Sequence, residues 1–135
     1  MICALFSCAP QSGPPTPGDQ WSKAVPFCSV AAEPKVLVDQ PLLIRGLFAD
    51  TPHGGLLYGT GCEEKAITLR GSENSPDDKE AGLVLRRAIQ QDSAARVEVI
   101  MFGILRQRPE TTPCSREACM RYELEETRLV AALAK

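Results

Sequence analysis

Short apolar segments separated by proline and glycine dominate the middle of the chain, a pattern typical of β-strands joined by tight turns. We expect the first strand over Val36–Val38 and Leu42–Phe48, with an interruption at Pro41, because proline cannot donate a hydrogen bond to a strand ladder. Gly46 stands in mid-strand, where a missing side chain suits strong coiling or the close approach of another backbone.

The next apolar segments follow a turn at Asp50–Gly55, in which two adjacent glycines tolerate positive φ. Leu56–Tyr58 and Ala66–Leu69 predict the second and third strands. We therefore expect the first two strands to form a β-hairpin, with the third strand close behind it.

One segment, Asp77–Gln91, has the spacing of an amphipathic helix. Ser75 or Asp77 can cap its first turn, where nearby acidic residues also suit the helix dipole. Leu83 and Ala88 fall near helical spacing and predict its apolar face.

Strand-forming residues return in the last third of the chain. Ala95–Arg106 is dense in such residues and predicts the fourth strand. A long loop over Gln107–Cys119 follows, and the alternation of apolar and polar residues that begins at Met120 predicts the fifth strand. Arg128–Lys135 closes the chain as a strand end or a short helical tail.

The order strand, strand, strand, helix, strand, strand resembles the OB-fold, a five-stranded Greek-key barrel with one helix between strands 3 and 4. The sequences Leu43-Ile-Arg-Gly-Leu-Phe and His53-Gly-Gly-Leu-Leu-Tyr, with Cys62 and Ile67-Thr-Leu, are also similar to OB-like domains of small exported bacterial proteins. The resemblance covers residues 35–130 and implies a mainly β fold, with a β-sandwich as the alternative. We therefore expect an OB-like β-barrel domain over 35–135.

The residues before this domain have a different composition. Met1–Pro10 is apolar and uncharged, and Leu5-Phe-Ser-Cys8 resembles the lipobox of bacterial lipoproteins, in which Cys8 would receive a lipid, although the phenylalanine departs from that pattern. A clipped secretory signal would explain this segment; the alternative is a disordered N-terminus with two incidental thiols. Ala9–Gln20 is rich in proline and predicts a semi-extended tether. We expect residues 1–34 to be largely disordered.

Composition narrows the functional classes. With 44% hydrophobic and 24% charged residues in 135, the chain suits a single globular domain. A formal net charge of −2 argues against a dedicated nucleic-acid binder, which needs a basic excess. Six cysteines favour either disulfides in an oxidising compartment or a metal site. There is no Cys-x-x-Cys pair and His53 is the only histidine, so we predict no metal and no cofactor.

Four cysteines are disulfide candidates: Cys28, Cys62, Cys114 and Cys119. Four cysteines allow three pairings, and the sequence does not choose among them. A Cys114–Cys119 bond would rigidify the loop before the last strand. Bonds from Cys28 or Cys62 to that loop would instead fasten the N-terminal segment and the hairpin to the barrel.

Candidates for a ligand rim lie in or next to the loops after strands one and four, which flank the ligand face of an OB-fold. They are His53, Tyr58, Arg106, Arg108, Arg116 and Arg121. Single-stranded nucleic acid would also need stacking aromatic residues on the strands. Tyr58 alone is on offer, because we expect Phe48 and Phe102 to point inward.

Catalysis has little support in the sequence. His53 could form a nucleophilic pairing with Cys62 near Asp50, but no third group and no oxyanion motif accompany them. We therefore predict no catalytic residue.

The sequence thus predicts an exported, non-catalytic binding or structural module in the periplasm or cell envelope. Its partner would be a protein or a small ligand, with the membrane reached only through a lipid on Cys8. The alternatives are a cytoplasmic OB-fold protein that binds single-stranded nucleic acid and, more weakly, an enzyme that uses His53 and Cys62.

Overall fold

The structure is a computed structural model of the 135-residue chain. It describes residues 21–51, 54–63, 65–71, 77–92, 96–108 and 119–134. The strands in these ranges are β1 (Val25–Pro26), β2 (Pro41–Thr51), β3 (Gly54–Tyr58), β4 (Ala66–Gly71), β5 (Val97–Gln107) and β6 (Cys119–Ala134). The mainly β fold class is confirmed.

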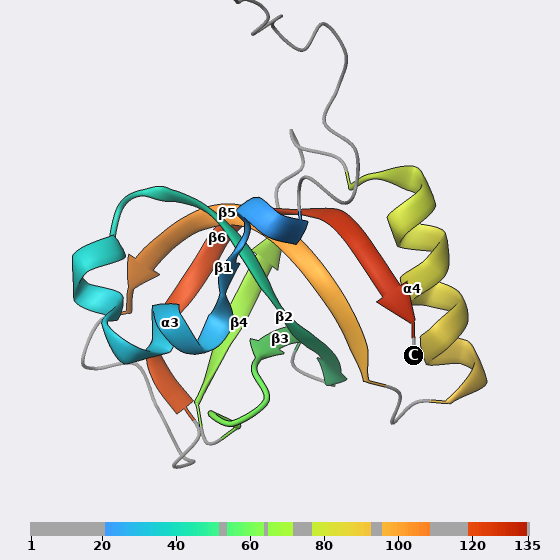
Figure 1. The fold of residues 1–135 in the computed structure, drawn as a ribbon, viewed down its shortest axis with the longest axis horizontal. Helices are drawn as coiled ribbons and strands as arrows, with labels where there is room; N and C mark the ends of the chain where they lie inside the picture. Colours follow the sequence, from blue (N-terminus) through green and yellow to red (C-terminus); the bar gives the residue numbers. More distant parts are fainter. Residues whose placement is uncertain are drawn as a thin grey trace, which may run out of the picture.

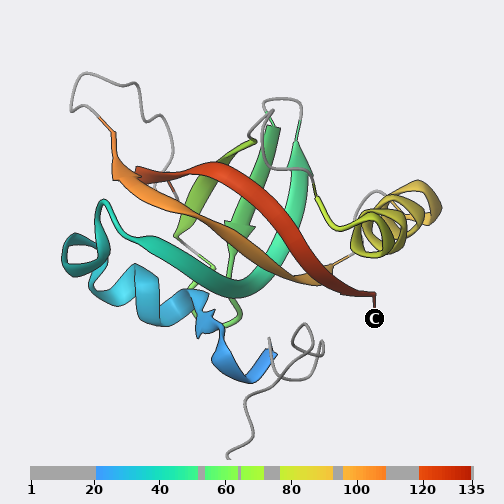
Figure 2. The ribbon, with the colours of Figure 1, turned by 90° about the horizontal axis from the view of Figure 1, so that it is seen from above.

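Within the described ranges, the strands form one six-stranded mixed sheet. β2 pairs antiparallel with β3 and β5, and β3 pairs antiparallel with β4. β6 pairs antiparallel with β5 and parallel with β4. Hydrogen bonds therefore run round a ring in the order β2–β3–β4–β6–β5 and back to β2, which we call the strand ring (Figures 1 and 2). β1 pairs with β2 in parallel at Ile44 and Arg45.

The predicted hairpin is confirmed as β2 and β3, with Leu47 opposite Tyr58 and Thr51 opposite Gly54. Gly46 has the role expected of it. A Cβ at this position would lie 2.7 Å from the carbonyl oxygen of Tyr58, so only a glycine lets the two backbones come this close.

The start of the first strand is where the sequence prediction is wrong. Pro34–Leu37 forms the 3₁₀-helix η1 instead, with Pro34 in the first turn, where its missing N–H is tolerated. The side chain of Val36 is 64% exposed. Asp39 then adopts a φ of 68°, and β2 begins at Pro41, since proline is accepted at the first position of a strand.

The segment before η1 is folded where the structure describes it. β1 leads into the helix α3 (Phe27–Ala32), whose Phe27 is 1% exposed in the main core cluster. Phe27 is therefore a core residue. Trp21 packs with Ala24 in a separate, smaller cluster around Ile100. Within the segment 1–34, residues 21–34 are therefore attached to the strand ring.

The predicted helix is confirmed as α4 (Lys79–Gln91), which lies between β4 and β5 in the chain. Its cap is Asp78, whose carboxylate accepts a hydrogen bond from the backbone N–H of Ala81 at 2.9 Å. The predicted apolar face is right at Ala88 and wrong at Leu83, which is 47% exposed. Ala81 is buried, and Leu85 and Ala88, at helical spacing from it, pack against the core.

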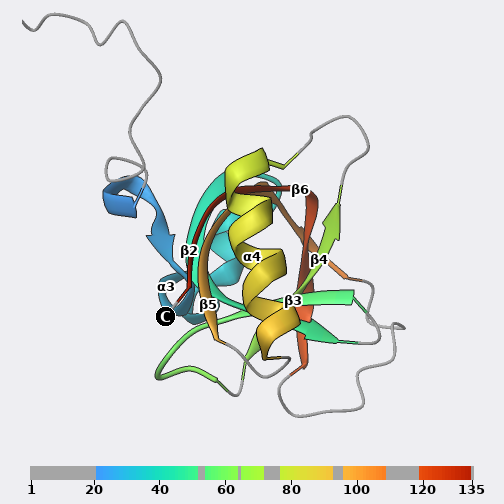
Figure 3. The same ribbon diagram turned by 90° about the vertical axis from the view of Figure 1, so that its right-hand side faces the viewer.

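The helices α3 and α4 lie at opposite ends of the strand ring (Figure 1), and α4 crosses in front of the opening of the ring in Figure 3. The side chains that point into the ring form the main core; the fully buried large ones among them include Phe27, Ile44, Leu57, Ile67, Leu105, Leu124 and Leu129. No helix in the described part of the chain is long and apolar enough to cross a membrane.

Candidate functional site

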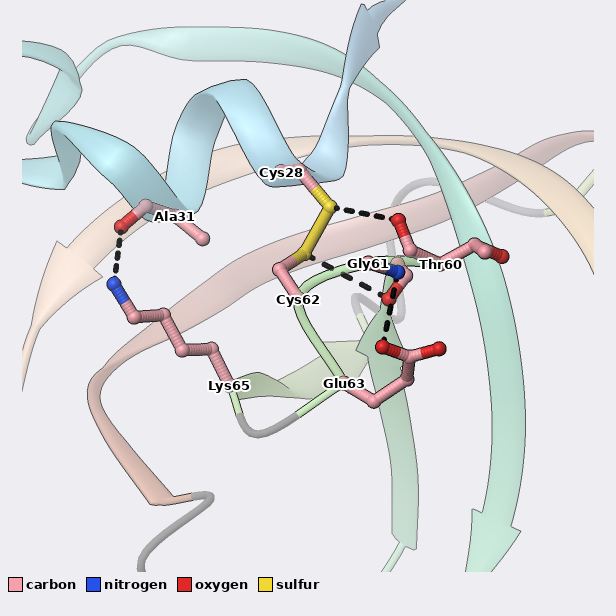
Figure 4. Close-up of a disulfide and its surroundings, with 8 residues drawn as sticks. Cys28, Ala31, Thr60, Gly61, Cys62, Glu63 and Lys65 are labelled. Atoms are coloured by element: carbon pink, nitrogen blue, oxygen red, sulfur yellow. Dashed lines mark hydrogen bonds between the residues drawn. A yellow bond between two sulfur atoms is a disulfide. The ribbon is translucent and has the colours of Figure 1, made fainter.

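A disulfide joins α3 to the connection between β3 and β4. The sulfur atoms of Cys28 and Cys62 lie 2.12 Å apart, and their Cα atoms lie 5.8 Å apart across a sequence separation of 34 (Figure 4). Cys28 is the second residue of α3, and Cys62 follows the end of β3 by four residues. The structure therefore links Cys28 and Cys62 to each other, and Cys114 lies outside the described residues.

The β3–β4 connection is shaped to bring Cys62 to the helix. Gly61 adopts a φ of +92°, and its backbone N–H donates to Glu63 Oε1 at 2.9 Å. A Cβ at Gly59 would lie 2.8 Å from Cys28 Sγ and 3.1 Å from Cys62 Sγ, so a side chain there would collide with the disulfide. The glycines at 59 and 61 serve the cross-link.

A hydrogen bond from Lys65 also links this connection to α3. Lys65 Nζ donates to the carbonyl oxygen of Ala31, near the C-terminal end of α3, at 3.3 Å (Figure 4). A cation at that end of a helix satisfies a carbonyl that has no partner within the helix. One connection between two strands thus holds α3 both covalently and by a charge-assisted hydrogen bond.

Arg106, a predicted rim residue, is held by two carboxylates. Its Nη1 lies 2.6 Å from Asp39 Oδ1, and its Nε lies 3.2 Å from Glu125 Oε1. Hydrogen bonds to Asp39 and then to Glu125 raise the pKa of the guanidinium above its usual value. The single positive charge of Arg106 is therefore compensated within the chain.

Arg108, a second predicted rim residue, is also paired. Its Nε lies 3.7 Å from Glu123 Oε1, and Arg70 Nη1 lies 3.3 Å from Glu123 Oε2. The Glu123 side chain is 12% exposed, so the two arginines screen it from water.

The two groups together contain three arginines and three carboxylates, so they are locally neutral. We call this set the ion-paired surface: Asp39, Arg70, Arg106, Arg108, Glu123 and Glu125. It lies across β4, β5 and β6, with Arg108 directly after β5 and Asp39 from the segment before β2.

Tyr58 belongs to the outer surface of the ring. Leu57 is fully buried in the core, and the neighbouring Tyr58 is half-buried, as the alternation of a strand requires. On the same outer face, Thr68 stands opposite both Leu56 and Glu123. Tyr58, Leu56 and Thr68 thus form a mixed surface beside the ion-paired surface; we call these three residues the β3–β4 face.

Phe102 does not point inward as predicted. It alternates with the buried Met101 and Gly103, so its ring lies on the outside, with the Arg128 guanidinium carbon 5.3 Å from its centre. Phe48 does pack against the main core. An aromatic residue is therefore present outside the ring, but an arginine covers it.

Several predicted site residues lie outside the described residues: Cys8, His53, Cys114 and Arg116. Cys119 and Arg121 belong to β6, but their side chains are outside the described part of the chain. Among the residues described, no three His, Cys, Asp or Glu side chains are grouped to hold a metal ion. In the disulfide, Cys62 carries no free thiol and is not available as a nucleophile.

Sequence reasoning missed the partners of the arginines and the role of Lys65. Glu123 and Glu125 alternate with buried residues on β6, a signal that places them outside the ring. Which arginines they meet depends on the register of β6 against β5, where Arg106 stands opposite Glu123. The alternation was readable in the sequence, and the register was not.

Comparisons of the chain with protein-family models, with curated proteins and with solved structures find no match.

Proposed function

We propose that this chain is an exported, non-catalytic binding or structural module built on an OB-like barrel. The observation that carries the proposal is the Cys28–Cys62 disulfide. Disulfides persist in oxidising compartments, such as the bacterial periplasm, and are rare in the cytoplasm. A bond that secures a core-forming helix to the strand ring is a structural use of cysteine, suited to such a compartment.

The OB-like assignment has its support in the topology. An OB-fold is a five-stranded Greek-key barrel, and here five strands pair in a ring with α4 between the third and the fourth. The parallel pairing of β4 with β6 closes the circuit that antiparallel neighbours alone would leave open. A β-sandwich would instead keep two separate sheets.

The binding surface of this module is the β3–β4 face. In OB-folds the second and third strands carry the ligand, and β3 and β4 are the corresponding strands here. Tyr58 offers an aromatic ring with a hydroxyl group, and Thr68 offers a second hydroxyl. The adjoining ion-paired surface has no surplus charge, so the surface suits a protein or a small ligand of the cell envelope better than a polyanion.

The same charge balance separates the proposal from its alternative, a binder of single-stranded nucleic acid. Such proteins combine a positively charged groove with stacking aromatic residues. Arg106 and Arg108 are paired with carboxylates, and Arg128 covers Phe102. Tyr58 remains as the one candidate for stacking among the predicted rim residues.

Membrane attachment is part of the proposal only through Cys8. A lipid on this residue, followed by the proline-rich segment Ala9–Gln20, would hold the module at a membrane surface. Metabolic labelling with a clickable fatty acid in the native host tests this, with Cys8→Ser as the control. Label on the wild-type protein but not on the variant supports the anchor; equal label on both, or label on neither, contradicts it.

Export is tested by the oxidation state of the cysteines. Protein from the native host is denatured and alkylated immediately, one sample without reduction and a second sample after reduction. The modified peptides of both samples are then mapped. We expect Cys28 and Cys62 to be modified only after reduction. Modification of both before reduction would show that the native compartment keeps them as thiols, and the export proposal would fail.

A further inference from the structure

The two cysteines of the disulfide differ in burial, although both contact the main core. Cys28 is half-buried, and its Sγ lies 3.3 Å from the carbonyl oxygen of Thr60 in the exposed connection. Cys62 is 9% exposed and belongs to the main core cluster with Phe27 and Leu57. A thiolate breaks a disulfide by attacking one sulfur atom directly, so it must reach that atom.

We propose that Cys28 is the sulfur through which this disulfide exchanges with external thiols such as glutathione. In reduction, the external thiolate attacks Cys28 Sγ and forms a mixed disulfide. The Cys28–Cys62 bond breaks, and its electron pair leaves on Cys62 Sγ, which then takes up a proton. A second external thiolate attacks the external sulfur atom of the mixed disulfide, forms the external disulfide and releases the Cys28 thiolate.

Oxidation runs through the same mixed disulfide in the opposite direction. The Cys28 thiolate attacks an external disulfide, such as oxidised glutathione, and releases one external thiolate. Cys62, as a thiolate, then attacks Cys28 Sγ, closes the bond and releases the second external thiolate. Cys28 is thus a site of reversible S-glutathionylation, and Cys62 is the resolving cysteine.

Two physical factors oppose one another in the choice of sulfur. A thiolate is costly to form in an apolar environment, so Cys62 is the poorer leaving group, which by itself favours attack on Cys62. Access favours attack on Cys28, because Cys62 packs in the main core cluster and a nucleophile reaches it only when this part of the core opens. That opening exposes Phe27 and Val30, which are 1% and 0% exposed, so it is rare in the native state. Access of the nucleophile therefore outweighs the leaving-group effect, and Cys28 is the sulfur that is attacked.

Peptide mapping of the mixed disulfide tests the assignment. The full chain, with Cys3, Cys8, Cys114 and Cys119 replaced by serine, is oxidised, treated briefly with reduced glutathione and quenched with acid. We expect glutathione on Cys28 to exceed that on Cys62 by at least about tenfold, the scale on which native openings limit access. Equal amounts, or an excess on Cys62, would overturn the proposal.

A matched pair of variants in the same serine background gives a second measurement. Cys62→Ser leaves Cys28 as the free thiol, and Cys28→Ser leaves Cys62. We expect the first thiol to react with an aromatic disulfide reagent at least about tenfold faster in buffer, and both to react equally in guanidinium chloride. Equal rates in buffer between two folded variants contradict the proposal. If a variant does not fold, its rate matches that in denaturant, and the glutathione map decides.

The proposal concerns purified protein and does not depend on the compartment. Glutathione mapped to Cys62 would overturn it without affecting export, whereas free thiols in the native host would overturn export alone.

Discussion

The two ends of the strand ring are closed by helices of different kinds. At one end, α3 has six residues and buries Phe27, Val30 and Ala31, and a disulfide and Lys65 attach it to the ring. At the other end, α4 has thirteen residues, of which only Ala81 is buried.

Polar groups before α4 attach it to the ring instead. Asp77 accepts a hydrogen bond from the backbone N–H of Leu129 at 2.8 Å, and the backbone N–H of Asp78 donates to the carbonyl oxygen of Leu129 at 2.8 Å. These bonds occupy the edge of β6 beyond its pairing with β4, which ends at Thr127. The short helix is therefore part of the core, and the long helix is a cover fixed at its N-terminal end.

The largest expected effect concerns the core contribution of α3. Replacing Phe27 by alanine removes a side chain that is 1% exposed and should lower the free energy of unfolding by about 3–5 kcal/mol. The matched change on α4, Leu83→Ala, affects a side chain that is 47% exposed and should change it by no more than about 0.5 kcal/mol. Urea unfolding followed by circular dichroism measures both. Equal losses at the two ends would show that the comparison is wrong.

Removing the covalent tie should be the next largest effect. Closing a loop with a sequence separation of 34 restricts the unfolded chain by about 3–4 kcal/mol on the chain-entropy model. We expect Cys28→Ser with Cys62→Ser to lower the free energy of unfolding by this amount. A reductant should lower the urea midpoint of the wild-type protein but not that of the double variant. An unchanged midpoint in the double variant would mean that packing alone holds α3.

The attachment of α4 should be weaker at any single residue. Asp78→Ala removes the side chain that caps the helix and should cost about 1 kcal/mol of stability. Asp78→Asn keeps an acceptor that caps equally well, so its stability should stay within a few tenths of a kcal/mol of the wild type. Thermal unfolding of both variants checks this. A cost for asparagine as large as that for alanine would show that charge, and not capping, is what matters at this position.

The two ends also differ in how far the sequence predicts them. α4 was predicted because thirteen residues contain several helical turns, although Leu83 was assigned to the wrong face. α3 was not predicted, because six residues give too few turns for a periodic signal and its stability comes from tertiary contacts. The same reason explains η1, where Val36 and Leu37 suit a strand by composition but lie in a helical turn after Pro34.

The candidate site follows the same division between local and long-range information. Cys28 and Cys62 were disulfide candidates, but their pairing depends on the docking of α3 and could not be read locally. Arg106 and Arg108 were predicted as ligand contacts because their charge can be read from the sequence, whereas the carboxylates that pair with them cannot. The fold places Glu125 beside Arg106 and Glu123 beside Arg108, and these carboxylates compensate the arginine charges.

We expect the smallest effect on stability from Glu123→Gln. This variant also tests directly whether the carboxylates compensate the arginine charges. Glu123 is 12% exposed, but its partners Arg70 and Arg108 are 65% and 22% exposed, so these ion pairs lie at the surface of the protein. Surface pairs contribute at most about 1 kcal/mol, so the variant should remain folded. It frees Arg70 and Arg108 from their shared carboxylate. The control Glu63→Gln makes the same change in net charge but frees neither arginine, since Glu63 accepts from the backbone of Gly61.

Binding of a labelled single-stranded oligonucleotide at several salt concentrations measures the result. The wild-type protein and Glu63→Gln should show no binding at low salt, because the ion-paired surface is neutral. Two freed arginines in Glu123→Gln should give weak binding whose logarithm falls with the logarithm of salt concentration at a slope of about −1.4. Binding by the wild-type protein with that slope or a steeper one would show that the carboxylates do not compensate the arginines, and would favour the nucleic-acid alternative over the proposed module.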